Sequence, residues 1–422
     1  MKKKLNKIAI IGMGYVGLPL AIEFQKYFSV IGFDINENRI ERLKINIDET
    51  KEVPKKDLIK AKSLFYTSNK INLSNSNIYI VCVPTPLKKS NQPDLKNLKL
   101  ACNIISEFLK KDDLVIFEST VYPGATEEVC VPILEKKSGL IFNKEFSVGY
   151  SPERINPGDR IHRIVNTVKI TSGSNPKALN IVDKLYKKIV KAGTFKASSI
   201  KAAEAAKIIE NTQRDLNIAL INEFSVIFDK MKLDTYEILK AAETKWNFIS
   251  FKPGLVGGHC IGVDPYYLTY KAKNLNLDPK VILAGREVND NMSAYLAKRL
   301  HQKISATKKL KNKILIMGVT FKEDCPDIRN SKVFDVIRML KKIGYKVDAQ
   351  DPYASYDEVL KIHKVKLIKK ILPNDYDAVL ISLAHSYYHK IGIKKIKTFI
   401  KKNGFILDLK NNFNFKNQFY QK

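Results

Sequence analysis

A single cysteine in a glycine-rich stretch is the first residue of this sequence that could do chemistry. Residues 254–269 read GLVGGHCIGVDPYYLT, so that Cys260 follows two glycines and His259, and Asp264 comes four residues later. A thiol in a loop can act as a nucleophile or can simply occupy a turn, and this stretch alone leaves both interpretations open. Adjacent residues of an extended segment usually point apart, so His259 is interpreted as a structural or substrate-shaping residue rather than as the partner of the thiol.

Three glycines near the N-terminus form a second pattern with a chemical use. Gly12, Gly14 and Gly17 have the spacing G-x-G-x-x-G and stand between a strand-like run and a helical stretch. In such a turn the first glycine permits the sharp bend, the second lets the backbone approach a pyrophosphate, and the third allows close packing of helix and strand. Asp34 ends the next strand, 22 residues after Gly12, where a carboxylate binds a ribose 2′-hydroxyl and repels a 2′-phosphate. The pattern predicts a dinucleotide site that prefers NAD to NADP.

A long helical run carries three polar side chains on one face. Lys207, Asn211 and Arg214 are spaced by four and three residues, which places them one turn apart. By itself this pattern is also typical of a solvated polar stripe. The core contact of the helix is expected from the opposite face, at Ile208, Ile209, Ile218 and Ala219.

Three further loops contain residues that are uncommon in ordinary turns. They read ESTVYPG (118–124), SPERINPG (151–158) and GVTFKEDCPDIRNS (318–331). The first two follow strand-like runs, and the ligands of open α/β sheets collect at the ends of strands. Each loop could be plain turn chemistry, but their joint occurrence favours a ligand site.

The elements that must position these residues alternate between strands and helices at both ends of the chain. Such alternation predicts an α/β protein with two Rossmann-like domains, each built on a doubly wound parallel sheet. The middle of the chain predicts helices, the first of them a single long helix over residues 198–232 with Ser198 or Ser199 as N-cap. We therefore expect an N-terminal dinucleotide-binding domain over 1–197, a central helical domain with the cysteine loop over 198–305, and a C-terminal Rossmann-like domain over 306–422. The strand-like runs are residues 7–14, 29–35, 78–83, 114–118 and 146–150 in the first domain, and 312–319, 345–352, 377–382 and 405–409 in the last.

The charge of the chain raises the question of a nucleic-acid partner. Its 422 residues carry a formal net charge of +30, as some nucleic-acid-binding proteins do. Only ten of the 73 basic residues are arginine, and the lysines are spread along the whole sequence. Clusters such as KKLKNK (308–313) are flanked by apolar runs. We interpret the excess as solvated lysines with a modest attraction for anionic substrates, and we expect no nucleic-acid partner.

Cysteine usage and hydropathy indicate the compartment. The five cysteines form no CxxC pair and no metal-like cluster with the six histidines, so no metal is expected. An odd count without regular spacing is typical of a reducing compartment, with Cys82, Cys102 and Cys130 as small buried hydrophobes and Cys325 in a loop. The basic and apolar N-terminus imitates a signal peptide but lacks a cleavage site, and no apolar run reaches the ~18 residues that cross a bilayer. We expect a soluble cytoplasmic protein without a membrane partner.

The motifs together resemble one protein family, the UDP-glucose/GDP-mannose dehydrogenases, which oxidise C6 of a nucleotide sugar to a uronic acid. The shared segments read GMGYVGLPLA, ESTVYPG, SPERINPG, KIIENTQRDLNIALINE, GGHCIGVDP, GREVND and GVTFKEDCPDIRNS, and they occur in the order of the family. They span nearly the whole chain, which makes the resemblance far more specific than a glycine motif alone. It implies an NAD-dependent enzyme that forms a homodimer through the central helix, or a larger homo-oligomer, with a UDP-sugar-binding C-terminal domain.

The resemblance also implies a role for individual residues. Cys260 takes the position of the nucleophile. Lys207 and Asp264 take those of the polar pair that handles the proton of the sugar hydroxyl and of water, and Asn211 helps them to hold the reacting oxygen.

Further positions of the family fall on residues of the two nucleotide sites. Glu153 and Thr120 stand where the family positions a water and contacts the nicotinamide side. NAD is expected at Gly12, Gly14, Tyr15, Val16, Gly17, Asp34, Arg39, Thr85 and Thr120, with Arg329 supplied by a neighbouring subunit. The nucleotide sugar is expected at Glu153, Arg154, Lys207, Asn211, Arg214, Gly257 and Lys322.

Oxidation of an alcohol to an acid requires the removal of two hydrides, which explains the need for a thiol. After the first removal the C6 aldehyde must not escape, and a thiolate can trap it as a thiohemiacetal. The second hydride goes to a fresh NAD, which leaves a thioester for water to hydrolyse. A lysine beside the developing oxyanion would stabilise it, and Gly257 and Gly258 would let the substrate approach the thiol. Cys260 is therefore interpreted as catalytic.

The cysteine loop also bears on the sugar. GGHCIGVDPYYLT resembles the branch that acts on UDP-N-acetylhexosamines, because the UDP-glucose branch has a small residue before the cysteine and a lysine where Val263 stands. We expect UDP-N-acetylglucosamine, with UDP-N-acetylmannosamine, UDP-N-acetylgalactosamine and UDP-glucose as alternatives, and a place in the synthesis of a surface polysaccharide or glycan. Three other classes stay open: a nucleic-acid-binding protein, a silent NAD-binding sensor, and a two-electron hydroxyacid dehydrogenase that needs no thiol. The NADH yield per sugar separates the enzymes, and a salt-dependent gel shift reveals the nucleic-acid binder.

Overall fold

The computed structural model describes residues 7–154, 164–307, 313–415 and 419–421. The chain divides into two compact units. Unit 1 comprises residues 1–210 and 266–278, and unit 2 comprises residues 211–265 and 279–422. Parts of two segments named above, 155–158 of SPERINPG and 308–312 of KKLKNK, lie outside the described residues.

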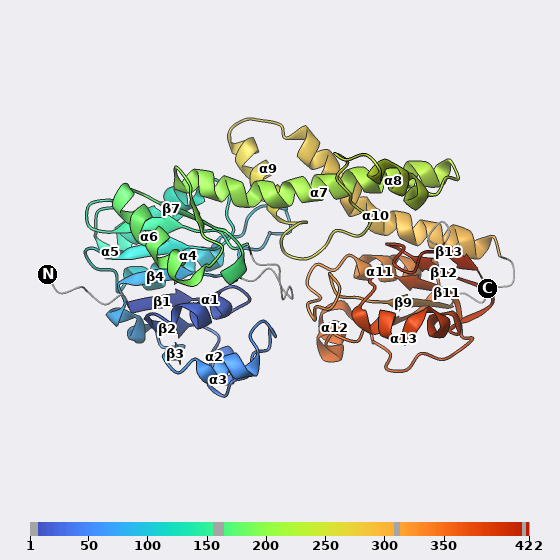
Figure 1. The fold of residues 1–422 in the computed structure, drawn as a ribbon, viewed down its shortest axis with the longest axis horizontal. Coiled ribbons are helices and arrows are strands. Elements are labelled where there is room, and N and C mark those ends of the chain that lie inside the picture. Colours follow the sequence, from blue (N-terminus) through green and yellow to red (C-terminus); the bar gives the residue numbers. More distant parts are fainter. Residues whose placement is uncertain (1–6, 155–163, 308–312, 416–418, 422) are drawn as a thin grey trace. The chain divides into compact units, whose positions relative to one another are not determined.

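Unit 1 is built on one twisted sheet of eight strands (Figure 1). The strands are β1 (Lys7–Ile11), β2 (Ser29–Phe33), β3 (Leu64–Thr67), β4 (Ile78–Val81), β5 (Leu114–Phe117), β6 (Ser147–Tyr150), β7 (Lys169–Gly173) and β8 (Thr194–Lys196). Their order is β3-β2-β1-β4-β5-β6-β7-β8. The six strands from β3 to β6 in this order are parallel, which confirms the expected doubly wound sheet. The structure adds an antiparallel pairing of β6 with β7.

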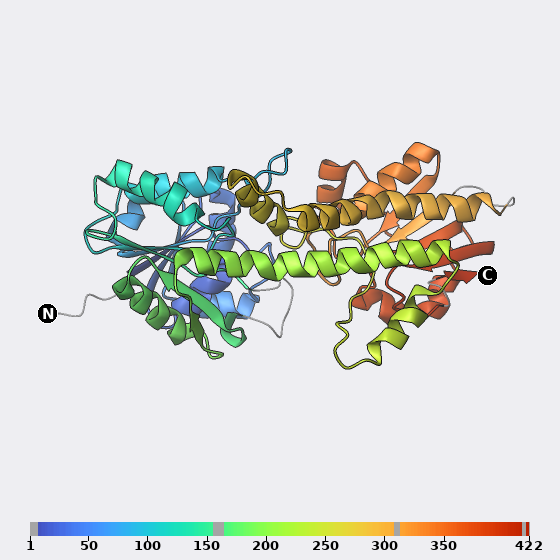
Figure 2. The same cartoon turned by 90° about the horizontal axis from the view of Figure 1, so that it is seen from above.

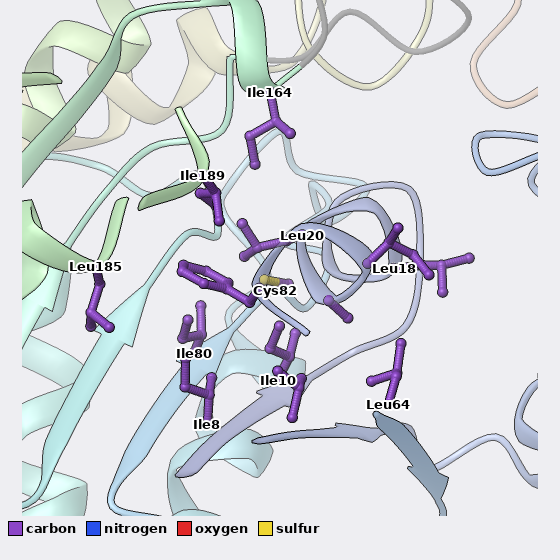
Figure 3. Close-up of a cluster of buried hydrophobic side chains, with 14 of the residues drawn as sticks. Ile8, Ile10, Leu18, Leu20, Leu64, Ile80, Cys82, Ile164, Leu185 and Ile189 are labelled. Carbon is purple, nitrogen blue, oxygen red and sulfur yellow. The ribbon is translucent and has the colours of Figure 1, made fainter. Parts of the chain in front are cut away.

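Helices cover both faces of this sheet. They are α1 (Gly17–Phe24), α2 (Glu37–Lys44), α3 (Lys55–Lys60), α4 (Lys96–Ser106), α5 (Val131–Ser138) and α6 (Pro176–Ile189), with short helical turns η1 (Lys70–Asn75), η2 (Thr126–Cys130) and η3 (Ile164–Asn166). Because both faces are covered, the central strands are apolar at consecutive positions rather than at alternate ones. Figure 3 shows one of the two layers, where β1 and β4 meet α1 and α6 and where Cys82 lies among aliphatic side chains. Cys82, Cys102 and Cys130 are all buried, which confirms their interpretation as small hydrophobes.

Unit 2 contains a second, separate sheet. Its strands are β9 (Lys313–Met317), β10 (Lys346–Gln350), β11 (Tyr376–Ile381), β12 (Ile400–Asp408) and β13 (Phe419–Gln421), in the order β10-β9-β11-β12-β13. All neighbours are parallel except β12 and β13. The helices of this unit are α8 (Thr235–Glu243), α10 (Lys280–Ser305), α11 (Val333–Ile343), α12 (Tyr356–His363) and α13 (Ser386–Lys397). The second α/β sheet is therefore confirmed as well. Cys325 lies in the loop before α11, as expected, but it is only 1% exposed.

Two helices carry residues of both units. They are α7 (Ile200–Lys230) and α9 (Asp264–Asn274). The long helix predicted over 198–232 is confirmed, and the hydroxyl of Ser199 accepts from the N–H of Ala202 at 3.1 Å, as an N-cap does. Within unit 2, the second half of α7 and α10 lie side by side and run in the same direction (Figure 2).

The expected buried face of α7 needs one correction. Ile208 and Ala219 are buried, but Ile209 is 62% exposed. The buried stripe follows the steps of four and three residues from Ile208 through Thr212 and Asp215, and Ile209 lies about 100° away from it on the helix.

The glycine turn of unit 1 yields a prediction on stability. A Cβ on Gly17 would lie 1.8 Å from the carbonyl oxygen of Gly12, whereas a Cβ on Gly14 would meet nothing within 4 Å. Gly17→Ala should therefore lower the free energy of unfolding by about 3 kcal/mol or more, and Gly14→Ala should change it by less than about 1 kcal/mol. Denaturant unfolding of both variants measures the difference. Equal losses would contradict the assigned packing of Gly17.

Candidate functional site

The glycine-rich turn of unit 1 has the geometry of a phosphate site. Gly12 has a φ of +98°, and a Cβ there would lie 2.9 Å from the carbonyl oxygen of Cys82. The open space beside Gly14 leaves its backbone accessible to a ligand. Tyr15 and Val16 form the turn into α1, and no side chain caps this helix. The N–H of Leu18 donates to the carbonyl oxygen of Gly14 at 3.3 Å, but no side chain occupies the positive end of the helix, where an anion is stabilised. The turn therefore fits the pyrophosphate of NAD.

Asp34 lies just beyond β2, and its carboxylate is held by backbone N–H groups. Its Oδ2 accepts from the N–H of Met13 at 2.8 Å, and its Oδ1 accepts from the N–H of Asn36 at 2.9 Å. Arg39 is 7% exposed and donates from Nε to the carbonyl oxygen of Met13 at 2.9 Å and from Nη2 to Asp48 at 2.7 Å. The structure thus brings Asp34 and Arg39 to the same turn, where both side chains form hydrogen bonds with the backbone of Met13.

The loops beyond β4 and β5 are joined by hydrogen bonds. The hydroxyl of Thr85 donates to the carbonyl oxygen of Thr120 at 2.6 Å, and that of Ser119 donates to the carbonyl oxygen of Val83 at 2.7 Å. Tyr267 of α9 donates its hydroxyl hydrogen to the carbonyl oxygen of Thr85. Both threonines are half-buried. Two predicted cofactor residues, Thr85 and Thr120, therefore lie together at the carboxyl edge of the sheet.

The first half of α7 is fastened to the loop beyond β5. Glu204 is fully buried and accepts from the N–H of Gly124 at 2.5 Å and from that of Thr126 at 3.0 Å. Burial raises the pKa of Glu204 to about 7. Lys207 follows one turn later and is 7% exposed, and within the described part of the chain its ammonium group has no hydrogen-bond or ion-pair partner. Its charge is therefore available to an oxygen of a ligand.

The loop beyond β6 holds two more predicted residues. Glu153 is 8% exposed. Arg154 donates from Nη1 to the carbonyl oxygen of Val168 at 2.9 Å and forms an ion pair with Glu210 at 2.8 Å. Arg154 is thus fixed near the start of β7, with its side chain partly exposed.

In unit 2 the cysteine occupies a turn that leads into a helix. The carbonyl oxygen of Cys260 accepts from the N–H groups of Val263 and Asp264, at 3.0 Å and 2.8 Å, and the side chain is half-buried. Asp264 is 2% exposed and accepts from Nδ2 of Asn211 at 2.6 Å. The structure therefore brings three predicted catalytic residues together. The turn links Cys260 to Asp264, and one hydrogen bond links Asp264 to Asn211. Arg214 lies one turn further along α7 and is exposed.

The two glycines before the cysteine serve the packing of the chain. A Cβ on Gly257 would lie 2.5 Å from the carbonyl oxygen of Asn330, and a Cβ on Gly258, whose φ is +79°, would lie 2.6 Å from the ring of Phe321. The expected reason for these glycines was access of the substrate to the thiol. The structure supplies a different one, since the loop over 318–331 lies against them.

His259 connects the cysteine turn to the same loop. Its Nε2 lies 2.7 Å from a carboxylate oxygen of Asp327 and 2.8 Å from Nη2 of Arg329, which also pairs with Asp327 at 2.7 Å. Burial would raise the pKa of Asp327, but the hydrogen bonds from His259 and Arg329 outweigh it and hold the pKa well below its ordinary range. These contacts agree with the interpretation of His259 as a structural residue.

Unit 2 repeats the glycine turn in a closed form. Gly318 follows β9 with a φ of +86°, and Asp351 follows β10 and accepts from the N–H of Val319 at 2.7 Å. Asp351 is fully buried and also lies 3.0 Å from Nε2 of His385. Nearby, a small pocket is lined by Gly257, Thr320, Phe321, Ser331, Lys332 and Lys410 among others. Lys322 follows Phe321 in the sequence, and its Nζ lies 5.8 Å from the ring centroid of Phe321.

Sequence reasoning missed residues that act through their neighbours. Asn222 of α7 accepts from the N–H of Gly254 at 2.8 Å and donates to its carbonyl oxygen at 3.0 Å, and it also contacts Asn289 of α10 at 2.8 Å. Asp327 and Glu204 are further examples. These residues, with Asn289, stand inside or beside segments quoted above. Apart from Arg329, which neighbours Asp327 in the chain, their partners lie far away in sequence, so the sequence held no signal for those contacts. Among the described residues no helix is long and apolar enough to span a membrane, and no cluster of three or more His, Cys, Asp or Glu side chains is arranged to hold a metal.

Comparison with known proteins matches nearly the whole chain to one family. Residues 6–190 match the NAD-binding domain of the UDP-glucose/GDP-mannose dehydrogenase family, residues 201–291 match its central domain, and residues 315–415 match its UDP-binding domain. The NAD-binding match contains the open glycine turn, and the UDP-binding match contains the loop that lies against the cysteine turn.

Individual relatives extend over the same length. The chain is 52% identical over 409 residues to the UDP-N-acetyl-D-glucosamine 6-dehydrogenase of Pseudomonas aeruginosa and 49% identical over 408 residues to that of Salmonella typhi, covering 96% of this chain and of each relative. The solved structure of the UDP-D-ManNAc dehydrogenase from Pyrococcus horikoshii superposes with a TM-score of 0.86 at 31% identity, covering 96% of this chain and 95% of that one. The chain therefore belongs to the UDP-glucose/GDP-mannose dehydrogenase family and is an NAD-dependent nucleotide-sugar dehydrogenase.

Proposed function

We propose that this chain oxidises C6 of UDP-N-acetylglucosamine to the carboxylate, and that it does so through a covalent intermediate on Cys260. The observation that carries the choice of sugar is the 52% identity, over 96% of both chains, to a UDP-N-acetyl-D-glucosamine 6-dehydrogenase. The relative named for UDP-D-ManNAc shares 31%, so that sugar is the second candidate.

The first half of the reaction converts the C6 alcohol to an aldehyde. NAD held at the turn of Gly12 and Gly14 would supply the acceptor for the hydride that leaves C6. Lys207 and Asp264, with Asn211 bonded to the latter, receive the hydroxyl proton and hold the oxygen from which it leaves. The half-buried thiol of Cys260 then adds to the aldehyde carbon and retains it as a thiohemiacetal. The intermediate therefore stays on the protein while the cofactor is exchanged.

The second half of the reaction converts the thiohemiacetal to the acid. Loss of a second hydride, for which a fresh NAD would be the acceptor, and of the hydroxyl proton to Lys207 and Asp264 leaves a thioester on Cys260. We assign Glu153 to the water that hydrolyses this thioester and Thr120 to the nicotinamide side of the site. A positive charge at Lys207 stabilises the oxyanion of each tetrahedral species.

Binding roles follow the positions of the family's motifs. We assign NAD to the turn of Gly12, Gly14, Tyr15, Val16 and Gly17, together with Asp34, Arg39, Thr85 and Thr120. We assign the UDP-sugar to Glu153, Arg154, Lys207, Asn211, Arg214, Gly257 and Lys322. In the proposed arrangement of domains, residues 1–197 bind NAD, residues 198–305 carry the nucleophile, and residues 306–422 bind UDP.

We propose a homodimer that pairs through the central helical region. Large apolar side chains are exposed there, among them Trp246 at 91%, Ile249 at 64% and Met231 at 59%. A monomer would leave them in water. The neighbouring subunit would then supply Arg329 to the cofactor. The cytoplasm is the proposed compartment because the five cysteines are free thiols, and the uronic acid would serve the synthesis of a surface polysaccharide or glycan.

The covalent mechanism predicts the yield of NADH. The protein should release about two NADH per UDP-N-acetylglucosamine consumed, because the alcohol reaches the acid without leaving Cys260. Cys260→Ser should form no uronic acid, since a serine hydroxyl is a poor nucleophile at neutral pH and a poor leaving group. Product analysis over a panel of UDP-sugars provides the measurement, and NAD titration of the variant by calorimetry shows that it is folded. One NADH per sugar with free aldehyde would refute the mechanism.

A second prediction concerns the charge on α7. Lys207→Ala should lower kcat by about 10²–10³-fold, the range observed when an oxyanion-stabilising donor is removed. Lys201→Ala is the matched control, because Lys201 lies on the same helix and is 58% exposed. Steady-state kinetics with both variants test this role. A loss of the same size in the control would point to damage to the helix instead.

A third prediction concerns the cofactor. The fixed carboxylate of Asp34 should disfavour the 2′-phosphate of NADP by several kcal/mol, which gives NAD an advantage of ~100-fold or more in kcat/KM. Asp34→Asn should shrink this ratio, while Glu37→Gln, an exposed change in the first turn of α2, should leave it unchanged. If the wild-type protein used both cofactors equally well, the assignment of Asp34 would be wrong.

A further inference from the structure

A buried ion pair lies at the carboxyl edge of the sheet in unit 1. Glu118 directly follows β5 and is 1% exposed, while Lys169 opens β7 and is 2% exposed. Tyr186 of α6, which is fully buried, completes the cluster. Moving two charges out of water costs free energy that a well-packed apolar pair would avoid, so the pair calls for a reason besides stability.

Every polar group of the cluster has a defined partner. Nζ of Lys169 donates to Oε2 of Glu118 at 2.5 Å and to the carbonyl oxygen of Pro152 at 2.9 Å. Oε1 of Glu118 accepts from the hydroxyl of Tyr186. The ammonium group also lies 5.2 Å from the centroid of the Tyr186 ring. Lys169 is therefore fixed in one orientation by groups from β5, α6 and the loop beyond β6.

The same ammonium group faces a residue of the proposed mechanism. Nζ of Lys169 lies 3.8 Å from Oε2 of Glu153, which is 8% exposed. Its contact with Pro152 fixes the backbone immediately before Glu153, and its contact with Glu118 fixes the strand end two residues before Thr120. One cation thus joins the segments that carry both Glu153 and Thr120.

The charge states support this arrangement. Burial would lower the pKa of Lys169, but Glu118 and Glu153 outweigh burial and raise it above its ordinary value. Burial raises the pKa of Glu118 to about 7, against the opposing effect of Lys169. Among the described residues the thiol of Cys82 also faces the cluster, and burial raises its pKa well above its usual range, so that it stays neutral. Lys169 is therefore held in its charged form beside Glu118 and Glu153.

We infer that Lys169, held by Glu118 and Tyr186, is a positioning residue for Glu153 in the hydrolysis of the thioester. The inference rests on the proposed function. In this step the oxygen of water forms a bond to the acyl carbon, the bond from that carbon to Sγ of Cys260 breaks, and the thiolate recovers a proton that the water releases. No electron is transferred. Lys169 keeps the Glu153 carboxylate aimed at the water and is not needed for either hydride removal.

The test separates hydrolysis from oxidation. Lys169→Met should accumulate the acyl-enzyme, because both oxidations proceed while hydrolysis slows by about 10- to 100-fold, as when an outer partner of a functional side chain is removed. Rapid mixing with NAD and UDP-N-acetylglucosamine should then show a burst of about two NADH per subunit followed by slow turnover. Mass spectrometry of the quenched protein should find the added uronyl group on Cys260. Lys188→Met, an exposed change on α6, is the control and should show neither.

Two further variants keep the inference falsifiable if Lys169→Met does not fold. Tyr186→Phe removes only the hydroxyl that holds Glu118 and should give a smaller burst of the same kind. Glu153→Gln should give the same adduct as Lys169→Met. Equal slowing of every step would overturn the role of Lys169 but not the proposed function. The absence of accumulated acyl-enzyme in folded Lys169→Met and Tyr186→Phe would have the same meaning. A wild-type yield of one NADH, with no adduct in any variant, would overturn the proposed function and this inference with it.

Discussion

Both sheets depend on one backbone arrangement, a glycine at the end of the first strand that is tied to an aspartate at the end of the second. In unit 1 the N–H of Gly12 donates to the carbonyl oxygen of Phe33 at 2.8 Å, and the next N–H donates to Asp34. In unit 2 the N–H of Gly318 donates to Gln350 at 2.9 Å, and the next N–H donates to Asp351. The arrangement sets the sharp bend by which the chain leaves the first strand of each sheet, and in unit 1 this bend leads into the proposed phosphate site.

The sequence predicts the first of these arrangements, at Gly12 and Asp34, because its cause is local. A glycine motif after an apolar strand and an acid at the next strand end are visible within about forty residues, which is the reach of a βαβ unit. The long helix is equally visible, since its period of 3.6 residues extends over many turns. Strand ends are predicted less well. The apolar run of β4 continues into Cys82, and that of β5 is followed directly by Glu118, but the pairing of these two strands ends at Val81 and Phe117.

Contacts between distant segments could not be predicted in the same way. Lys169 looks like one more lysine in a chain of 73 basic residues, and only the fold shows that it is buried between two carboxylates. Ile209 looks as apolar as Ile208, and only the packing of α7 decides that one is buried and the other exposed. Asn222 has an ordinary helical sequence around it, yet it supports the backbone before the cysteine turn. Each case requires knowledge of a partner that sequence spacing does not give.

The difference between the two glycine turns bears on why the proposed mechanism uses a thiol. Asp34 is partly exposed beside an uncapped helix, whereas Asp351 is fully buried, with its carboxylate engaged by backbone N–H groups and His385. Within the described part of the chain, only the first turn therefore has the open form that fits a dinucleotide. Two hydrides must be removed from one carbon, but two molecules of NAD cannot occupy one turn at once. The reduced cofactor has to leave between the two oxidations, at the stage when the sugar is an aldehyde that could also leave. In the proposed mechanism a covalent bond to Cys260 retains the sugar during that exchange, so the single open turn and the proposed nucleophile answer the same requirement.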